Sequence, residues 1–211
     1  MTATDLQRQT LRLYGELLAR SERWAGKLVF ASGEGASATG LPAAVSIAGG
    51  TSLILDSDAA TVKVVFRSGG IDFVVNTLDE ALRVLKNEIR QHKPLSVALI
   101  ADIEPTLAEI SERGVQPDLR WEVFSSPTTE LTAWLESQSW SAHEFTAPTT
   151  TALRTLDTSL LEAMPPDDSI RRAWLQRVTH YQRPTANSSR LLWLTPAEAA
   201  HLATGKLETG S

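Results

Sequence analysis

Short runs that are almost wholly apolar alternate with helical patterns along the first two thirds of this chain. The clearest runs span 27–31, 52–56 and 95–100. A strand that is apolar throughout, rather than at every second position, is buried on both faces of its sheet. Helices must then cover both faces and connect the parallel strands. The sequence therefore predicts an α/β fold with a doubly wound, mainly parallel, Rossmann-like sheet.

The predicted sheet domain comprises residues 24–140, and an N-terminal helix precedes it. Their remaining elements follow from periodicity and capping residues. An N-terminal helix is expected within residues 1–23, with Thr4 as its N-cap. Thr77 and Glu80 form a capping box at the start of a later helix. The expected helices span 5–20, 41–48, 62–66, 78–89, 105–113 and 129–138, and further strands are expected at 73–75 and 119–124.

After residue 139 the composition changes, and residues 141–211 are predicted to form a small helical C-terminal appendage. Residues 146–151 read as a linker. Two helical patterns then follow on either side of Pro165-Pro166, and a capped helix begins near Thr195. Such a segment is too small to enclose a large core by itself. We expect it to dock on the sheet domain or on another subunit.

The appendage is locally basic. Its cationic residues are Arg171, Arg172, Arg177, His180, Arg183 and Arg190. They are interpreted as a solvated helix face or as an interface partner for the acidic body, and alternatively as a phosphate or nucleic-acid contact.

Composition excludes several classes of site and protein. The chain has 20 basic and 25 acidic residues, and its net charge of −5 argues against a dedicated nucleic-acid or anionic-membrane binder. It contains no cysteine, so disulfides, thiolate metal sites and a cysteine nucleophile are excluded. Its four histidines lack metal-ligand spacing, so no metal site is expected. Without a signal-peptide pattern or a long apolar stretch, the expected location is cytoplasmic.

The candidate site lies at the first glycine-rich loop. Ligands of open α/β sheets bind beyond the carboxyl ends of the strands. The loop reads Gly33-Glu34-Gly35-Ala36-Ser37-Ala38, which fits the G-x-G-x-x-A form of the dinucleotide fingerprint. Asp56 ends the next strand, where an acidic residue would bind ribose hydroxyls. The alternative is a glycine-rich turn kept for packing, and the charge of Glu34 inside a phosphate loop favours that alternative.

Four segments together resemble the urocanase (urocanate hydratase) family. They are the loop-to-strand segment 33–56, Thr77-Leu78-Asp79-Glu80-Ala81-Leu82, Pro94-Leu95-Ser96-Val97-Ala98-Leu99 and Arg113-Gly114-Val115-Gln116-Pro117-Asp118. Their order and spacing are kept over residues 24–118, a little under half of the chain.

The resemblance implies an NAD⁺-binding, Rossmann-like domain and a homodimer. In urocanase NAD⁺ acts as an electrophile that forms an adduct with the imidazole of the substrate. The implied cofactor-binding positions are Gly33, Gly35, Ala36, Ser37, Ala38, Asp56, Asp102 and Ser125. The sequence departs from the family where an expected arginine falls on Thr61 and where only Ser125 remains of the family segment that follows the Pro117-Asp118 turn. The essential cysteine and the flanking catalytic regions are missing, so no catalytic residue is assigned.

Three functions remain open. The first is a urocanase-like, non-catalytic module that keeps a weakened nucleotide site and acts through assembly. The second is the cofactor-domain subunit of a urocanate hydratase-type lyase that another chain completes. The third is a structural dimer without a ligand. For the homodimer, a twofold interface that includes residues 165–205 is expected, because the missing urocanase parts would leave the sheet domain uncovered.

Overall fold

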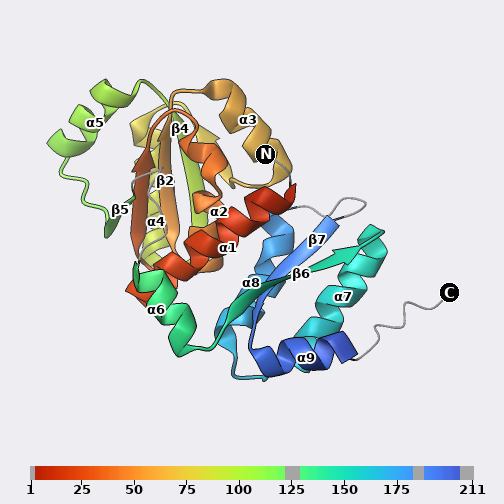
Figure 1. The fold of residues 1–211 in the computed structure, drawn as a ribbon. Helices are drawn as coiled ribbons and strands as arrows, with labels where there is room; N and C mark the ends of the chain where they lie inside the picture. Colours follow the sequence, from red (N-terminus) through yellow and green to blue (C-terminus); the bar gives the residue numbers. More distant parts are fainter. Residues whose placement is uncertain (1–2, 122–128, 183–187, 205–211) are drawn as a thin grey trace.

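The computed structural model describes residues 3–121, 129–182 and 188–204 (Figure 1). Within these residues a five-stranded sheet has the order β3-β4-β2-β1-β5, and every neighbouring pair is parallel. Its strands are β1 (Leu28–Ser32), β2 (Thr51–Asp56), β3 (Phe73–Val75), β4 (Leu95–Ile100) and β5 (Leu119–Trp121). The predicted parallel sheet is confirmed, although residues 122–124 of the last expected strand lie outside the described part.

The central strands are buried along almost their whole length, as their apolar composition predicts. All six residues of β2 are buried, and only the last residue of β1 and of β4 is partly exposed. Leu53 of β2 lies opposite Phe30 of β1 on one side and Val97 of β4 on the other. Strands β3 and β5 have three residues each and form the two edges.

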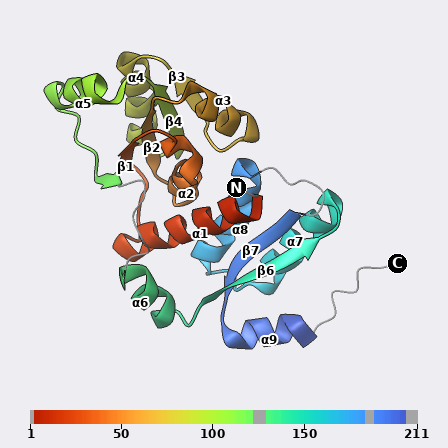
Figure 2. The same cartoon turned by 45° about the horizontal axis from the view of Figure 1, so that its top comes forward.

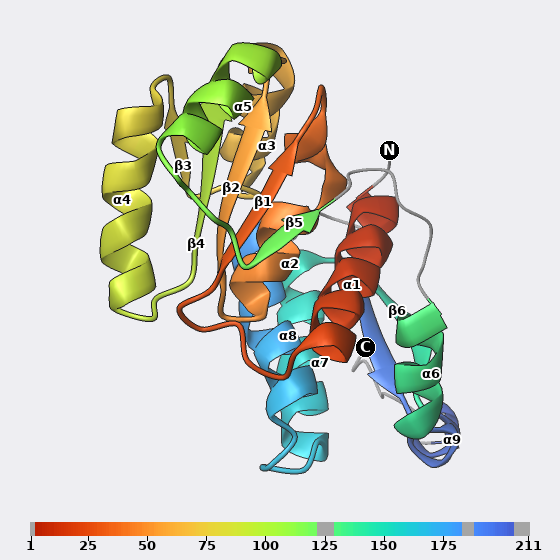
Figure 3. The ribbon, with the colours of Figure 1, turned by 90° about the vertical axis from the view of Figure 1, so that its left-hand side faces the viewer.

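Helices cover both faces of this sheet, so the fold is doubly wound (Figure 3). Helices α4 (Leu78–Arg90) and α5 (Ile103–Glu112) lie on one face, where Leu85 and Ile110 belong to one cluster with Phe30 and Leu99. Helices α2 (Leu41–Ile47) and α3 (Ala59–Ser68) lie on the other face. The predicted N-cap Thr77 is confirmed, because its side chain accepts a hydrogen bond from the N–H of Glu80 at 3.3 Å.

Helix α1 (Ala3–Arg20) lies between the sheet domain and the C-terminal region (Figure 2). The ring of Tyr14 stacks on Trp174 and Trp193 with centroids 5.9 and 5.8 Å away, and its hydroxyl donates to the carbonyl of Ile170 at 3.0 Å. The expected N-cap Thr4 is wrong. The helix already includes Thr4, whose hydroxyl lies 3.0 Å from that of Ser189.

The C-terminal region contains the three expected helices and, in addition, a small antiparallel sheet. Its elements are β6 (Ser141–Ala147), α7 (Thr150–Ala163), α8 (Ser169–Tyr181), β7 (Ser188–Leu194) and α9 (Pro196–Thr204), and α6 (Thr129–Ser137) precedes them. The linker expected at 146–151 is wrong. Thr146 and Ala147 end β6, and Thr149 caps α7 by accepting from the N–H of Ala152 at 3.1 Å.

The basic residues of this region are mostly tied to other parts of the chain, so the interpretation as a solvated face is wrong for the buried ones. Arg190 is 1% exposed and forms a two-pronged ion pair with Asp157, at 2.6 and 2.8 Å. Arg171 is 3% exposed and reaches Glu198 at 2.7 and 2.9 Å. Arg177 donates to the carbonyl of Ile47 at the end of α2 (3.0 Å), which fixes the C-terminal region on the sheet domain.

Candidate functional site

The glycine-rich loop leaves the carboxyl end of β1 and runs through a short 3₁₀ turn, η1 (Ala36–Thr39), into α2. Gly35 has φ of 75°, in the left-handed region that favours glycine. The neighbouring strand β2 ends at Asp56, which is fully buried. The structure thus brings Gly33, Gly35, Ala36, Ser37, Ala38 and Asp56 together, as the sequence predicts.

The carboxylate of Asp56 accepts four hydrogen bonds from its own chain. Its Oδ1 accepts from the N–H of Gly35 at 3.0 Å and from that of Asp58 at 2.9 Å. Its Oδ2 accepts from the N–H of Ser37 at 3.0 Å and from the hydroxyl of Ser37 at 2.5 Å. A carboxylate offers about four acceptor positions. Asp56 therefore has no lone pair left for a ribose hydroxyl.

The N–H groups of the other predicted cofactor-binding residues in the loop are engaged as well. The N–H of Gly33 donates to the carbonyl of Leu55 at 3.1 Å. Those of Ala36 and Ala38 donate to the carbonyls of Gly33 and Gly35, at 3.1 and 3.0 Å. With Gly35 and Ser37 bound to Asp56, all five predicted loop residues give their N–H to an acceptor within the chain.

These contacts decide whether NAD⁺ fits the loop as it is folded here. A dinucleotide fold binds pyrophosphate through loop N–H groups at a helix N-terminus and binds ribose through the acid that follows. Here the buried carboxylate of Asp56 already occupies the position of an anion in the loop. In this closed arrangement the residues present do not fit the pyrophosphate or the ribose.

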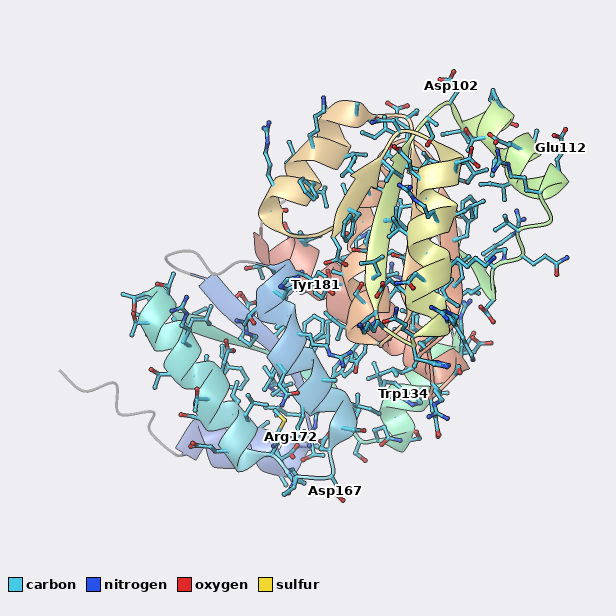
Figure 4. All side chains as sticks on the ribbon, turned by 180° about the vertical axis from the view of Figure 1, so that it is seen from behind. Asp102, Glu112, Trp134, Asp167, Arg172 and Tyr181 are labelled. Atoms are coloured by element: carbon cyan, nitrogen blue, oxygen red, sulfur yellow. The ribbon has the colours of Figure 1, made fainter. Side chains whose placement is uncertain are left out.

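The remaining residues around the loop are arranged for local structure. Glu34 is exposed. Thr61, where the family pattern places an arginine, donates its hydroxyl to Asp58 at 2.5 Å. That bond, with the backbone N–H of Thr61, lowers the pKa of Asp58, which caps α3. Asp102 lies exposed at the start of α5 and points to solvent (Figure 4). Ser125 lies outside the described residues.

Gly40, at the end of the loop, has a packing role that the fingerprint did not indicate. It has φ of 76°, and a Cβ built on it would lie 2.5 Å from the hydroxyl oxygen of Thr10 on α1. That hydroxyl is itself held, because it donates to the carbonyl of Leu6 at 2.7 Å and accepts from Gln182 Nε2 at 3.0 Å. Glycine here allows α1 to approach the loop closely.

Residues 3–121, 129–182 and 188–204 contain neither a cluster of metal ligands nor a membrane-spanning helix. Within these ranges no group of three or more histidine, aspartate or glutamate side chains is placed to hold a metal ion. None of the helices in the same part of the chain is both long and apolar enough to cross a bilayer.

Comparison with known protein families agrees with this architecture. The model of the urocanase Rossmann-like domain matches residues 9–130, more than half of the chain. The match includes α1 from residue 9 onward, the glycine loop, the whole parallel sheet and the first residues of α6. It stops before β6 and the C-terminal region that packs against α1. The chain therefore belongs to the urocanase family, through its Rossmann-like domain.

Proposed function

We propose that this chain is a non-catalytic urocanase-type module whose nucleotide loop is closed by its own aspartate and which acts through assembly or ligand binding. The observation that carries the proposal is the set of four hydrogen bonds that Asp56 accepts, two of them from loop N–H groups. NAD⁺ could enter only if Asp56 released those donors. A buried charge without its partners costs several kcal/mol, on the order of 3–5.

The absence of cysteine from the sequence supports the same proposal, because the urocanase resemblance implies an essential one. The competing function, a cofactor subunit completed by another chain, needs the loop to hold NAD⁺. The engaged donors of Gly35 and Ser37 disfavour it.

The test is a hydration assay on the full chain with NAD⁺ and urocanate. The expected result is that the ultraviolet absorbance of urocanate stays constant over hours. The control is the Asp56→Asn variant, which removes the competing charge; it should remain inactive, since the chain carries no catalytic cysteine. A loss of absorbance with a rate proportional to the concentration of the unmodified protein would show that the module is catalytic.

A further inference from the structure

A cavity of about 340 Å³ lies beside the closed loop, between α1, η1 and α3. Its walls are mainly aliphatic or small, with Leu6 from α1, Ala43 from α2, and Val64 and Val65 from α3. The end of α8 contributes Gln182 together with Tyr181. The volume falls at the lower end of the range of about 300–1,000 Å³ that small-molecule sites occupy. It suits a small organic molecule.

No charged side chain is found among the described residues that line this cavity. The lining comprises Leu6, Thr10, Ser37, Ala38, Gly40, Ala43, Ala60, Thr61, Val64, Val65, Ser68, Gly70, Tyr181 and Gln182. An ion that leaves water for such a wall loses its hydration and gains no counter-charge. Charge complementarity therefore selects an uncharged occupant.

The aliphatic hydroxyls in the lining all donate their proton within the chain. They do so at Thr10 (to Leu6 O, 2.7 Å), Ser37 (to Asp56, 2.5 Å), Thr61 (to Asp58, 2.5 Å) and Ser68 (to Val65 O, 2.8 Å). A hydroxyl that donates in this way still has lone pairs and can only accept. These four groups favour a ligand that supplies a donor.

Gln182 adds an acceptor of the same kind. Its Nε2 donates to Thr10 Oγ1 at 3.0 Å, which sets the orientation of the amide. Its Oε1 is buried and has no hydrogen-bond partner. A buried acceptor without a donor costs about 1–3 kcal/mol.

We propose that the cavity between α1, η1 and α3 binds an uncharged, mainly apolar small molecule that carries one hydroxyl or N–H donor. The apolar walls supply the binding free energy through burial of the ligand's hydrocarbon part. The lining offers no cationic side chain to a carboxylate or phosphate, and the hydroxyls that already donate within the chain favour a ligand that supplies the donor. The cavity shares Ser37 and Ala38 with the glycine loop, but it needs none of the N–H groups that the loop engages, so it works with that loop closed.

Calorimetric titration of the full chain with 1-octanol, and with octanoate at pH 7 as its charged counterpart, tests the class of ligand. Saturable binding of 1-octanol is expected, with octanoate at least tenfold weaker. The amide resonances of Gly40 and Gly70, which line the cavity, should shift with 1-octanol. Equal affinity for octanoate, or no saturable binding of 1-octanol, overturns the proposal.

A matched pair of variants on α3 tests whether the ligand binds in this cavity. Val64 lines the cavity and is 64% exposed, whereas Phe66 is 45% exposed and is not part of the lining. Because both side chains are exposed, an aspartate at either position should leave the packing of the hydrophobic core intact. Val64→Asp should weaken 1-octanol binding at least tenfold, and Phe66→Asp should leave it unchanged. Equal effects of the two changes reject this site. If Val64→Asp instead dissociates a dimer in light scattering, the surface is a protein interface and the small-molecule proposal is wrong.

Discussion

Gly40 shows how one residue joins the glycine loop to the N-terminal helix. Gly40→Ala adds a Cβ 2.5 Å from the held hydroxyl of Thr10 and forces an L-residue into φ of 76°. The two costs together should lower the free energy of unfolding by about 2–4 kcal/mol. Gly114→Ala is the control, because Gly114 has φ of 64° but nothing within 4 Å of its Cβ. Chemical denaturation should show the larger loss for Gly40→Ala, and equal losses would contradict the close approach of α1.

Glu198 gives the molecule an acid-sensitive contact. Hydrogen bonds from Arg171 are the main cause that lowers its pKa from 4.5 to about 2. A carboxyl group with a lowered folded-state pKa stabilises the fold above its unfolded pKa, and this stability is lost as pH falls toward the folded value. We therefore expect the melting temperature to fall between pH 4.5 and 2. Glu198→Gln should be less stable at pH 7 and should lose less over that interval, and an identical pH profile for both proteins would be inconsistent with this contact.

At the scale of elements, the ion pair between Arg190 of β7 and Asp157 of α7 holds the small sheet on its helix. Arg190→Met leaves a buried carboxylate without its partner, which typically costs about 3–5 kcal/mol. The double change Arg190→Met with Asp157→Leu removes both charges and should recover most of that loss. Thermal and denaturant unfolding of the three proteins measures the difference. A double variant as unstable as the single one would show that packing, rather than the unpaired charge, causes the loss.

The elements also show where sequence reasoning succeeds and fails. The strands β1, β2 and β4 were predictable because burial on both faces demands apolar residues at every position. Strand β6 was missed because it is mostly exposed and polar, with Ser141, His143 and Glu144 among its residues. Its strand character comes from pairing with β7, which lies about fifty residues away in sequence.

The location of the candidate site was predictable from the sequence, but the closure of its loop by Asp56 was not. The fingerprint placed Gly35, Ser37 and Asp56 at one end of the sheet, and the structure brings them together. The sequence could not show that the acid turns inward to the loop, because that depends on the path of the backbone between Gly33 and Ala38. Likewise, no local pattern indicated that Arg190 would be buried, since its partner Asp157 lies on another element.

At the scale of the whole molecule, the C-terminal region covers α1 and α2 within the same chain. Tyr14 lies between Trp174 and Trp193, and Arg177 reaches the end of α2. A chain truncated after Ser139 would expose this face to water. We expect it to bind a hydrophobic dye and to unfold without a cooperative transition, followed by circular dichroism. A stable, soluble and cooperatively folding truncated chain would show that the sheet domain does not need this cover.

The homodimer remains a prediction, but the structure changes which surface is expected to form its interface. The apolar surface that was expected to require a partner is covered in cis by residues of α8 and β7. Among the residues that the structure describes, the large apolar side chains that remain exposed are Val64, Phe66 and Phe73, on α3 and β3. Light scattering at micromolar concentration measures the oligomeric state. If a dimer forms, Phe73→Asp should weaken it more than a charge reversal within residues 165–205.

The central claim is that Asp56 closes the glycine loop against the pyrophosphate of NAD⁺. Its most direct test is a titration of the ¹⁵N-labelled chain with NAD⁺, in which the amide resonances of Gly35 and Ser37 are followed. Because both N–H groups are bound to Asp56 at 3.0 Å, we expect slow hydrogen exchange at both and no saturable shift up to millimolar NAD⁺. Saturable shifts of both amides at micromolar NAD⁺ would contradict the closed loop.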